Sequence, residues 1–369
     1  RYYGSRIKLG QDQKGNTLSE LDPKSKLYDS SRKYDIRASK LIFKPQGTHS
    51  RKDIKDLMIY AKGGLNLALY NANENARALK KFVDKVITEI KETQEYKDAT
   101  AEEKKNMINE RVGHNKIQNL LTSKEARLEE ELKGNKELLN IINVMVNHIE
   151  QLGAILIEEG LVDGPLAAAI DANRGIYLHR KYKLYGKKAY SPTEDVRNRA
   201  ILFIVSELKG KKANEGKSDS ELYDMAEKKV DLILRRESGS LDFLSQGFGK
   251  VITADTSIFK SRNENLPEEI RNLLGEVNDP YNNYITTVGK IAQTIASDRL
   301  YEDLLSIGLG DFISAPMEGD ASLPEGESQR FSGNQLKGRK WGALEGYFVD
   351  NEMYSVLNSF DESVRSAQW

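Results

Sequence analysis

The sequence predicts a mostly α-helical protein, built as an elongated multi-helix bundle or set of hairpins, with long loops and little β-structure. Apolar residues recur at helical spacing over long stretches. Short connections that contain glycine or proline separate these stretches. Of the 369 residues, 30% are charged and 38% are hydrophobic. This composition suits long helices that keep much of their surface in water better than one large sphere.

Residues 1–52 are predicted to form an irregular N-terminal arm, because glycine and proline interrupt its short apolar pieces. The piece Leu41-Ile42-Phe43 fits a brief strand or an extended arm on a neighbouring molecule, and a simple surface loop remains the alternative. The chain opens with Arg1 rather than methionine. We therefore expect a segment of a longer polypeptide.

Residues 53–164 are predicted to form a long-helix hairpin or bundle. The first helix spans about 53–94, and we expect Gly63 and Gly64 to kink or split it. A second helix, dense in Glu and Lys, spans about 100–133, and a third spans about 136–159. Gly134-Asn135 is the expected turn between them. The first helix carries its apolar stripe at Ile54, Leu57, Met58, Ala61, Leu65, Ala68, Leu69, Ala72, Leu79, Phe82, Val83, Val86 and Ile90.

Residues 165–236 are predicted to form a helical unit with a basic and aromatic segment. Pro165 suits the start of its first helix. A serine cap at Ser191, Pro192 in the first turn and Glu194 three residues later predict the start of the next helix. Its apolar residues run to Leu208. Another amphipathic helix follows at 218–236.

Residues 237–369 are predicted to form a helical C-terminal unit with long loops. A connection at 237–264 leads to a helix at about 267–274 and a long helix from about 280 to 307. Gly308 and Gly310 suit the C-terminal end of that helix. Residues 308–340 should be an extended loop or weak β-structure, followed by a strand at 347–349 and a last helix to about 364.

The basic and aromatic segment at 172–192 is the best candidate for a binding site. Lysine and arginine can contact phosphates, and tyrosines can stack on bases. The alternative is that Tyr177, Tyr182 and Tyr185 pack inward while the cations stay in water. The candidate nucleic-acid-binding residues are Arg174, His179, Arg180, Lys181, Lys183, Lys187 and Lys188.

The charge balance limits what such a segment can do. The chain has 56 basic and 56 acidic residues and no cysteine. A neutral chain has no overall attraction for nucleic acid or anionic membranes, so any such contact needs a local patch. The missing cysteines exclude disulfides, thiolate nucleophiles and any zinc or iron–sulfur site that needs sulfur ligands. Polar residues interrupt the most apolar stretch, 138–157, which is not expected to cross a membrane.

No arrangement of catalytic or cofactor-binding residues is visible in the sequence. The four histidines, His49, His114, His148 and His179, lack metal-ligand spacing. No phosphate-binding glycine loop and no nucleophile elbow is present. Paired acids such as Glu268-Glu269 suit a helix start, where the helix dipole favours them. We therefore expect no catalytic residue, metal or cofactor in this segment.

Three runs in the second half of the chain resemble large phage-encoded proteins. Residues 175–185 read Gly-Ile-Tyr-Leu-His-Arg-Lys-Tyr-Lys-Leu-Tyr, and Ser-Pro-Thr-Glu-Asp-Val follows at 191–196. Residues 265–280 read Asn-Leu-Pro-Glu-Glu-Ile-Arg-Asn-Leu-Leu-Gly-Glu-Val-Asn-Asp-Pro, and Leu-Glu-Gly-Tyr-Phe-Val stands at 344–349. These runs are similar to the internal virion, or ejection, proteins of short-tailed phages and to polyvalent proteins delivered with phage DNA. The resemblance covers about residues 170–360.

The resemblance implies a structural role and supplies no catalytic residue. Such a protein would be packaged inside the capsid near the portal, as a ring or stack of copies. It would leave with the genome and help form a DNA-translocation conduit across the host periplasm and envelope. The implied partners are further copies, the portal, other internal virion proteins, phage DNA and the host envelope. Two alternatives stay open: a nucleic-acid-binding module, or a non-catalytic part of a virion murein hydrolase or RNA polymerase.

Overall fold

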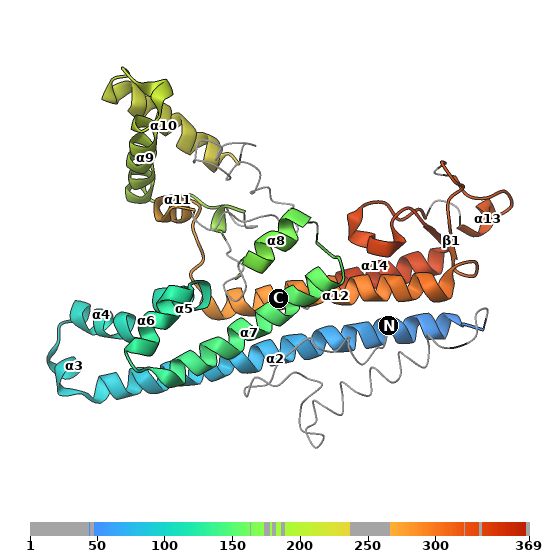
Figure 1. Ribbon diagram of the computed structural model, residues 1–369, viewed down its shortest axis with the longest axis horizontal. Helices are drawn as coiled ribbons and strands as arrows, with labels where there is room; N and C mark the ends of the chain where they lie inside the picture. The colour runs from blue at the N-terminus through green and yellow to red at the C-terminus, as the bar shows by residue number, and fades with distance from the viewer. Residues whose placement is uncertain are drawn as a thin grey trace. The chain divides into compact units, whose positions relative to one another are not determined.

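The computed structural model describes residues 44, 48–162, 164–172, 178, 182–185, 189–236, 266–320, 322–331 and 334–366. The mostly α-helical class is confirmed (Figure 1). Strands within these ranges are limited to β1 (Ile313–Ser314) and β2 (Phe348–Val349). None of the described helices combines the length and the apolar character that a membrane span needs.

Backbone contacts group the chain into two compact units that interleave along the sequence. Unit 1 takes residues up to Leu161, the stretch Ile170–Leu178 and everything from Pro280 onward. Unit 2 takes Val162–Ala169 and His179–Asp279. This division differs from the sequence prediction, which placed α11 (Glu268–Leu273) and α12 (Pro280–Gly308) in one C-terminal unit. The apolar face of each helix decides its unit, since α11 packs on α9 (Glu194–Lys209) and α12 packs on helices from the first half.

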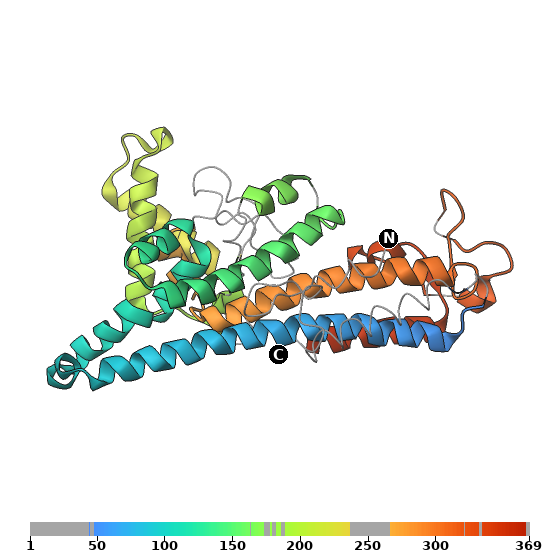
Figure 2. The same ribbon diagram turned by 60° about the horizontal axis from the view of Figure 1, so that its bottom comes forward.

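Unit 1 is organised around three long helices: α2 (Arg51–Glu92), α7 (Lys136–Glu158) and α12. Each packs against the other two. Figures 1 and 2 show α2 and α12 side by side along most of their length. Because helix α12 also contacts α5 and the short helix η4 (Arg339–Leu344), it is buried on several sides rather than along one stripe.

Helix α2 has 42 residues, which corresponds to about 63 Å at about 1.5 Å per residue. It begins after Ser50, whose hydroxyl and backbone pair with Asp53 in a capping box. The expected kink or split at Gly63 and Gly64 is wrong, because the helix continues through both residues. Packing of the buried Gly63 position outweighs the cost of about 1 kcal/mol that each glycine brings to a helix interior.

The single helix expected at 100–133 is also wrong. The structure has α4 (Ala101–Val112), α5 (His114–Thr122) and α6 (Lys124–Leu132) instead, and the short α3 (Gln94–Asp98) precedes them. Gly113 is extended between α4 and α5, and a Cβ there would lie 2.6 Å from the Asn109 carbonyl oxygen. Ser123 separates α5 from α6 and caps the latter. These breaks turn Ile117, Leu120 and Leu121 into the core.

The turn expected at Gly134-Asn135 is confirmed. Gly134 has a φ of +83°, and the Asn135 side chain accepts a hydrogen bond from Leu138 at the start of α7. The next helix, α8 (Gly164–Ala172), begins beside Pro165 as the sequence indicates.

The C-terminal part of unit 1 contains a small antiparallel sheet. Ile313 of β1 lies opposite Val349 of β2. Helix α12 ends at Gly308, and α13 (Ser328–Phe331) interrupts the loop that follows. The expected strand at 347–349 and the helix after it, α14 (Asn351–Ser366), are both confirmed. Arg51 of α2 pairs with Asp350 at 3.1 Å, which fixes this end of α2 to the start of α14.

Unit 2 is a small helical unit of α9, α10 (Asp219–Leu234) and α11, with the short helices η2 (Lys183–Tyr185) and η3 (Lys212–Asn214). Helix α9 starts two residues later than expected. Thr193, not Ser191, is its cap and accepts a hydrogen bond from Val196. The buried core of the unit consists of Leu184, Ala200, Ile201, Ile204, Leu208, Leu222, Ala226, Val230, Ile233, Ile270, Leu273 and Leu274.

Gly275, at the end of α11, allows the backbone to pass close to the Tyr190 ring. Its φ is +69°, and an added Cβ would lie 2.6 Å from the Tyr190 ring. The Tyr190 hydroxyl donates a hydrogen bond to the Asn272 carbonyl at 3.2 Å, which holds the ring there. The glycine is therefore required by both the backbone conformation and the ring.

Gly275→Ala should lower the free energy of unfolding of unit 2 by about 2–3 kcal/mol, from left-handed strain of about 1 kcal/mol and displacement of the ring. Gly216→Ala is the matched control, because Gly216 has a φ of +90° and nothing within 4 Å of the added Cβ. Urea denaturation followed by circular dichroism measures both variants. Equal losses for the two would show that the Tyr190 contact contributes nothing.

Candidate interaction surface

The basic and aromatic segment lies mostly outside the described residues. Arg174, His179, Arg180, Lys181, Lys187 and Lys188 are not described, and Tyr177 is not either. Lys183 is described and exposed, on η2. Its backbone N–H donates to the Gly275 carbonyl at 2.9 Å, so η2 lies against the end of α11.

Two of the tyrosines in this segment pack inward. Tyr182 and Tyr185 lie against the core of unit 2. Burial raises the pKa of Tyr185 to about 12, although the Arg236 guanidinium over its ring opposes the shift. Both side chains are partly buried against this core. This packing is the arrangement expected when the tyrosines pack inward while the cations stay in water.

Two of the described histidines, His114 and His148, contact tyrosines of α12. His148 is fully buried on α7, and its Nδ1 lies 2.9 Å from the Tyr284 hydroxyl on α12. His114 stacks edge-on against Tyr281, with ring centroids 5.8 Å apart. Among the described residues, no group of three or more histidine, aspartate or glutamate side chains could hold a metal ion.

Tyr284 connects the three long helices through polar contacts. Its hydroxyl accepts a hydrogen bond from Asn75 Nδ2 of α2 at 3.0 Å and also contacts His148 of α7. Tyr284 and His148 are each 0% exposed, and Asn75 is 2% exposed. Burial raises the pKa of Tyr284, so the hydroxyl keeps its proton. A polar contact of this kind fixes the register of packed helices, because any slip leaves buried groups without partners.

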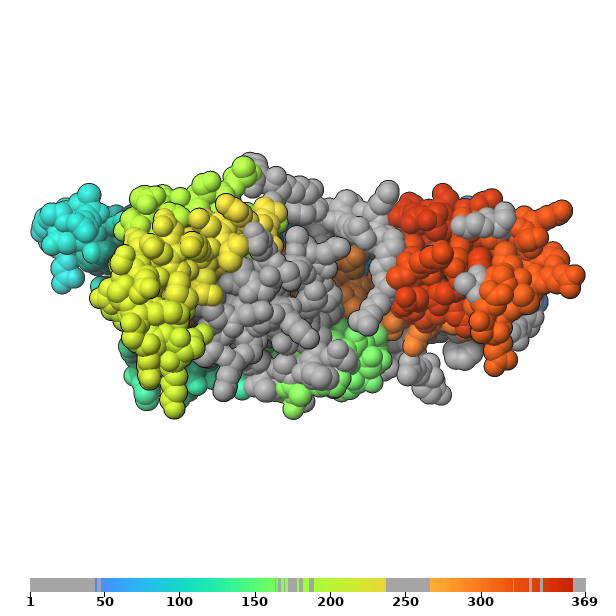
Figure 3. Space-filling model, turned by 90° about the horizontal axis from the view of Figure 1, so that it is seen from above, coloured from blue at the N-terminus to red at the C-terminus, as the bar shows by residue number. Residues whose placement is uncertain are grey.

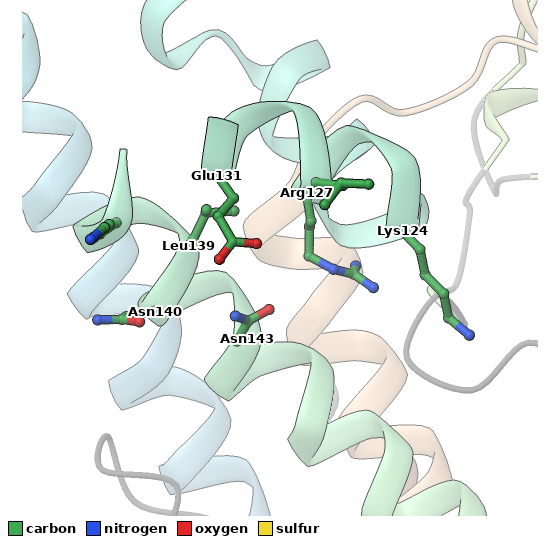
Figure 4. A pocket seen from close by; sticks show the side chains of 8 residues that line it. Lys124, Arg127, Glu131, Leu139, Asn140 and Asn143 are labelled. Carbon is green, nitrogen blue, oxygen red and sulfur yellow. The ribbon is translucent and has the colours of Figure 1, made fainter. Parts of the chain in front are cut away.

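A groove lies between α6 and α7 (Figure 4). Its volume is about 420 Å³. The carboxylate of Glu131 and the amide of Asn143 point toward one another across it, with Arg127 beside them. The lining residues are Lys124, Arg127, Leu128, Glu131, Lys136, Leu139, Asn140 and Asn143.

Two leucines of α6 are exposed, and one of them, Leu128, lines this groove. Leu128 is 60% exposed and Leu132 is 82% exposed. They are four residues apart, so they lie on one face of the helix. Solvated leucines at this spacing, next to a groove, are typical of a surface that packs against another protein.

Contacts within unit 1 hold α6 firmly in place. Lys116 of α5 pairs with the buried Glu130 at 3.0 Å. Arg127 donates to the Leu120 carbonyl at 2.8 Å. Burial lowers the pKa of the Arg127 guanidinium, and the charges of Glu125 and Glu150 oppose this shift. Because these contacts anchor the inner face of α6, Leu128 and Leu132 are presented on a rigid helix.

Sequence reasoning missed this surface. The stretch 124–133 is dense in Glu and Lys, and the sequence predicts it as part of one long helix. The signal was present in the four-residue spacing of Leu128 and Leu132 between charged residues. Only the break at Ser123, which sets the rotation of α6, shows that this leucine pair faces away from the core.

No family model, no curated protein and no solved structure matches this chain.

Proposed function

We propose that this chain is a structural component of a phage particle that works by assembling with further copies of itself rather than by catalysis. The observation that carries the proposal is the exposed pair Leu128 and Leu132 on the anchored helix α6. The phage context comes from the sequence runs at 175–196, 265–280 and 344–349. The chain is packaged inside the capsid near the portal and leaves with the genome to help form a conduit.

The charges around the two leucines suit a second copy of the same helix. A two-fold interface brings the same patch of both copies together in opposite directions. With α6 pairing antiparallel about Leu128, Lys124 of one copy lies beside Glu131 of the other. The two-fold axis repeats this attractive pair, which favours self-association over contact with an unrelated apolar surface.

The double variant Leu128→Glu with Leu132→Glu should abolish self-association. Burying two leucines contributes about 3 kcal/mol or more, which corresponds to about 100-fold or more in the dissociation constant. Sedimentation velocity over a concentration series measures the effect. We expect the natural chain to form dimers or larger species and the variant to stay monomeric.

Leu202→Glu is the matched control, because Leu202 is a leucine of unit 2 that is 61% exposed on α9. It should leave self-association unchanged. A natural chain that is monomeric at every soluble concentration would refute assembly through α6, and so would equal effects of the two replacements.

The location of the protein tests the phage part of the proposal separately. Purified particles of the phage that encodes this chain should contain it, protected from added protease until the genome is ejected. Mass spectrometry of treated and untreated particles measures this. Digestion of the chain in intact particles, or its absence from them, would contradict packaging inside the capsid.

A further inference from the structure

The loop between α9 and α10 gathers positive charge at the end of a helical hairpin. Residues 209–217 read Lys-Gly-Lys-Lys-Ala-Asn-Glu-Gly-Lys, with four lysines and one glutamate. Lys209, Lys212 and Lys217 are exposed, and Lys211 is half-buried. The two helices and this loop belong to unit 2 and appear in yellow-green and yellow in Figures 1 and 3.

The fold holds this loop in one shape. Asn214 is 9% exposed, and its Nδ2 donates to the Leu208 carbonyl at 2.9 Å. Its Oδ1 accepts from Lys217 Nζ at 2.7 Å. Backbone hydrogen bonds also close the turn, from Asn214 to Lys211 and from Lys217 to Asn214. The lysines are thus displayed on a pre-organised turn, which lowers the entropy lost on binding a ligand.

Positive charges are held close together at the base of this loop. Lys229, on α10, is half-buried, and burial lowers its pKa while the nearby charge of Lys211 lowers it further. Two ammonium groups placed near one another repel, and an anion between them relieves that repulsion. Asp219 offsets part of the charge by pairing with Lys209 at 2.8 Å, although both side chains are largely exposed. Lys211, Lys212 and Lys217 remain the main contributors to the patch.

We propose that the loop 209–217 is a contact site for the phosphate backbone of nucleic acid. This inference goes beyond the proposed function and uses a different surface from the groove of α6 and α7. Lysine ammonium groups on a rigid turn suit phosphate contacts that do not depend on base sequence. The loop carries no apolar side chain larger than Ala213, whereas binding to a lipid surface usually adds aromatic or leucine anchors to the basic residues.

The affinity of this site for DNA should fall as the salt concentration rises. Three phosphate contacts, from Lys211, Lys212 and Lys217, give a slope of about −2.7 in log affinity against log salt. Affinity for duplex DNA should then fall about 40-fold between about 50 and 200 mM salt. Fluorescence anisotropy of the full chain with a labelled duplex of random sequence measures both quantities.

The double variant Lys211→Gln with Lys212→Gln should bring the slope to about −0.9 and weaken binding at low salt by about 10-fold or more. Lys80→Gln with Lys81→Gln is the matched control, because these lysines form an exposed adjacent pair on α2. Its slope should equal that of the natural chain. Thermal unfolding followed by circular dichroism checks that all variants keep their fold.

Further variants separate this site from the other surfaces. Arg180→Gln with Lys181→Gln tests the segment at 174–188, and the α6 variant Leu128→Glu with Leu132→Glu tests assembly. Both should keep the salt slope, so failure of assembly and failure of this site are distinguishable. An unchanged slope in Lys211→Gln with Lys212→Gln would overturn the proposal. Binding of the chain to phosphatidylserine vesicles without any binding to DNA would overturn it as well.

Discussion

Replacing Tyr284 with alanine should lower the free energy of unfolding of unit 1 by about 3–5 kcal/mol. The side chain is 0% exposed, on a helix that packs against α2, α5 and α7. Removing a large aromatic ring from such a site leaves a cavity that the neighbouring helices cannot close without losing their own contacts. Urea denaturation followed by circular dichroism measures the loss.

Tyr284→Phe separates the contribution of the hydroxyl from that of the ring. It keeps the ring but removes the partner of Asn75 Nδ2 and of His148 Nδ1. Leaving buried polar groups without partners costs about 1–3 kcal/mol. The difference between the two variants then gives the packing contribution. If the variant with phenylalanine is as stable as the natural chain, the polar contact does not contribute to stability.

Tyr70→Ala is the matched control on α2, in the same unit. Tyr70 is 48% exposed. A surface replacement of this kind should change stability by less than about 0.5–1 kcal/mol. A loss at Tyr70 as large as that at Tyr284 would show that tyrosine content, rather than the buried position, decides the result.

The apolar periodicity of the chain was sufficient to predict most of the helices. Helix α7 was expected at about 136–159 and spans Lys136–Glu158, because its apolar stripe is long and its start is marked by Gly134-Asn135. Helix α10 was expected from Ser218, which is its cap. In both cases a local signal, the cap, and a longer signal, the stripe, agree.

Breaks and buried polar residues could not be predicted in the same way. Gly63 lies within a continuous helix, whereas Gly113 separates two helices. The residue type is identical, and tertiary packing decides the outcome. The burial of Asn75 and His148 was also missed, since polar residues within an apolar stripe do not show which partner they meet on another helix.

The exposure of the candidate surface depends on how α6 is rotated more than on the composition of the helix. Leu128 and Leu132 were visible in the sequence, but the same spacing would also suit a core stripe. The caps at Asn135 and Ser123 set where α7 and α6 start, and the pair of Lys116 with Glu130 turns the opposite face of α6 inward. Contacts of this kind join residues that lie on different helices, so no local sequence pattern reveals them.

Replacing Asp303 with asparagine should raise the free energy of unfolding of unit 1 above neutral pH. At pH 8 the expected gain is about 3–5 kcal/mol. Asp303 is 7% exposed on α12, beside the buried residues Leu300, Leu304 and Ile307. Burial raises the pKa of its carboxyl from 3.8 to about 8. One turn earlier, the Arg299 guanidinium is engaged by Glu159, with its Nε 2.9 Å from a carboxylate oxygen.

The direction of the pH dependence follows from where the proton is held. The folded chain keeps the proton of Asp303 up to about pH 8, whereas the unfolded chain loses it near pH 3.8. The folded state therefore binds more protons between these values, and its stability falls as pH rises through this window, by up to about 1.4 kcal/mol per pH unit. Asparagine cannot ionise, so Asp303→Asn removes this part of the pH dependence.

Urea denaturation between about pH 5 and 8, where the folded chain keeps this proton and the unfolded chain does not, compares the natural chain with Asp303→Asn. The difference in unfolding free energy should grow steadily with pH. Asp84→Asn is the matched control, because Asp84 is an exposed aspartate on α2 of the same unit. Its curve should run parallel to that of the natural chain. Parallel curves for Asp303→Asn would mean that Asp303 is ionised in the folded chain, and that its neighbours stabilise the charge despite burial.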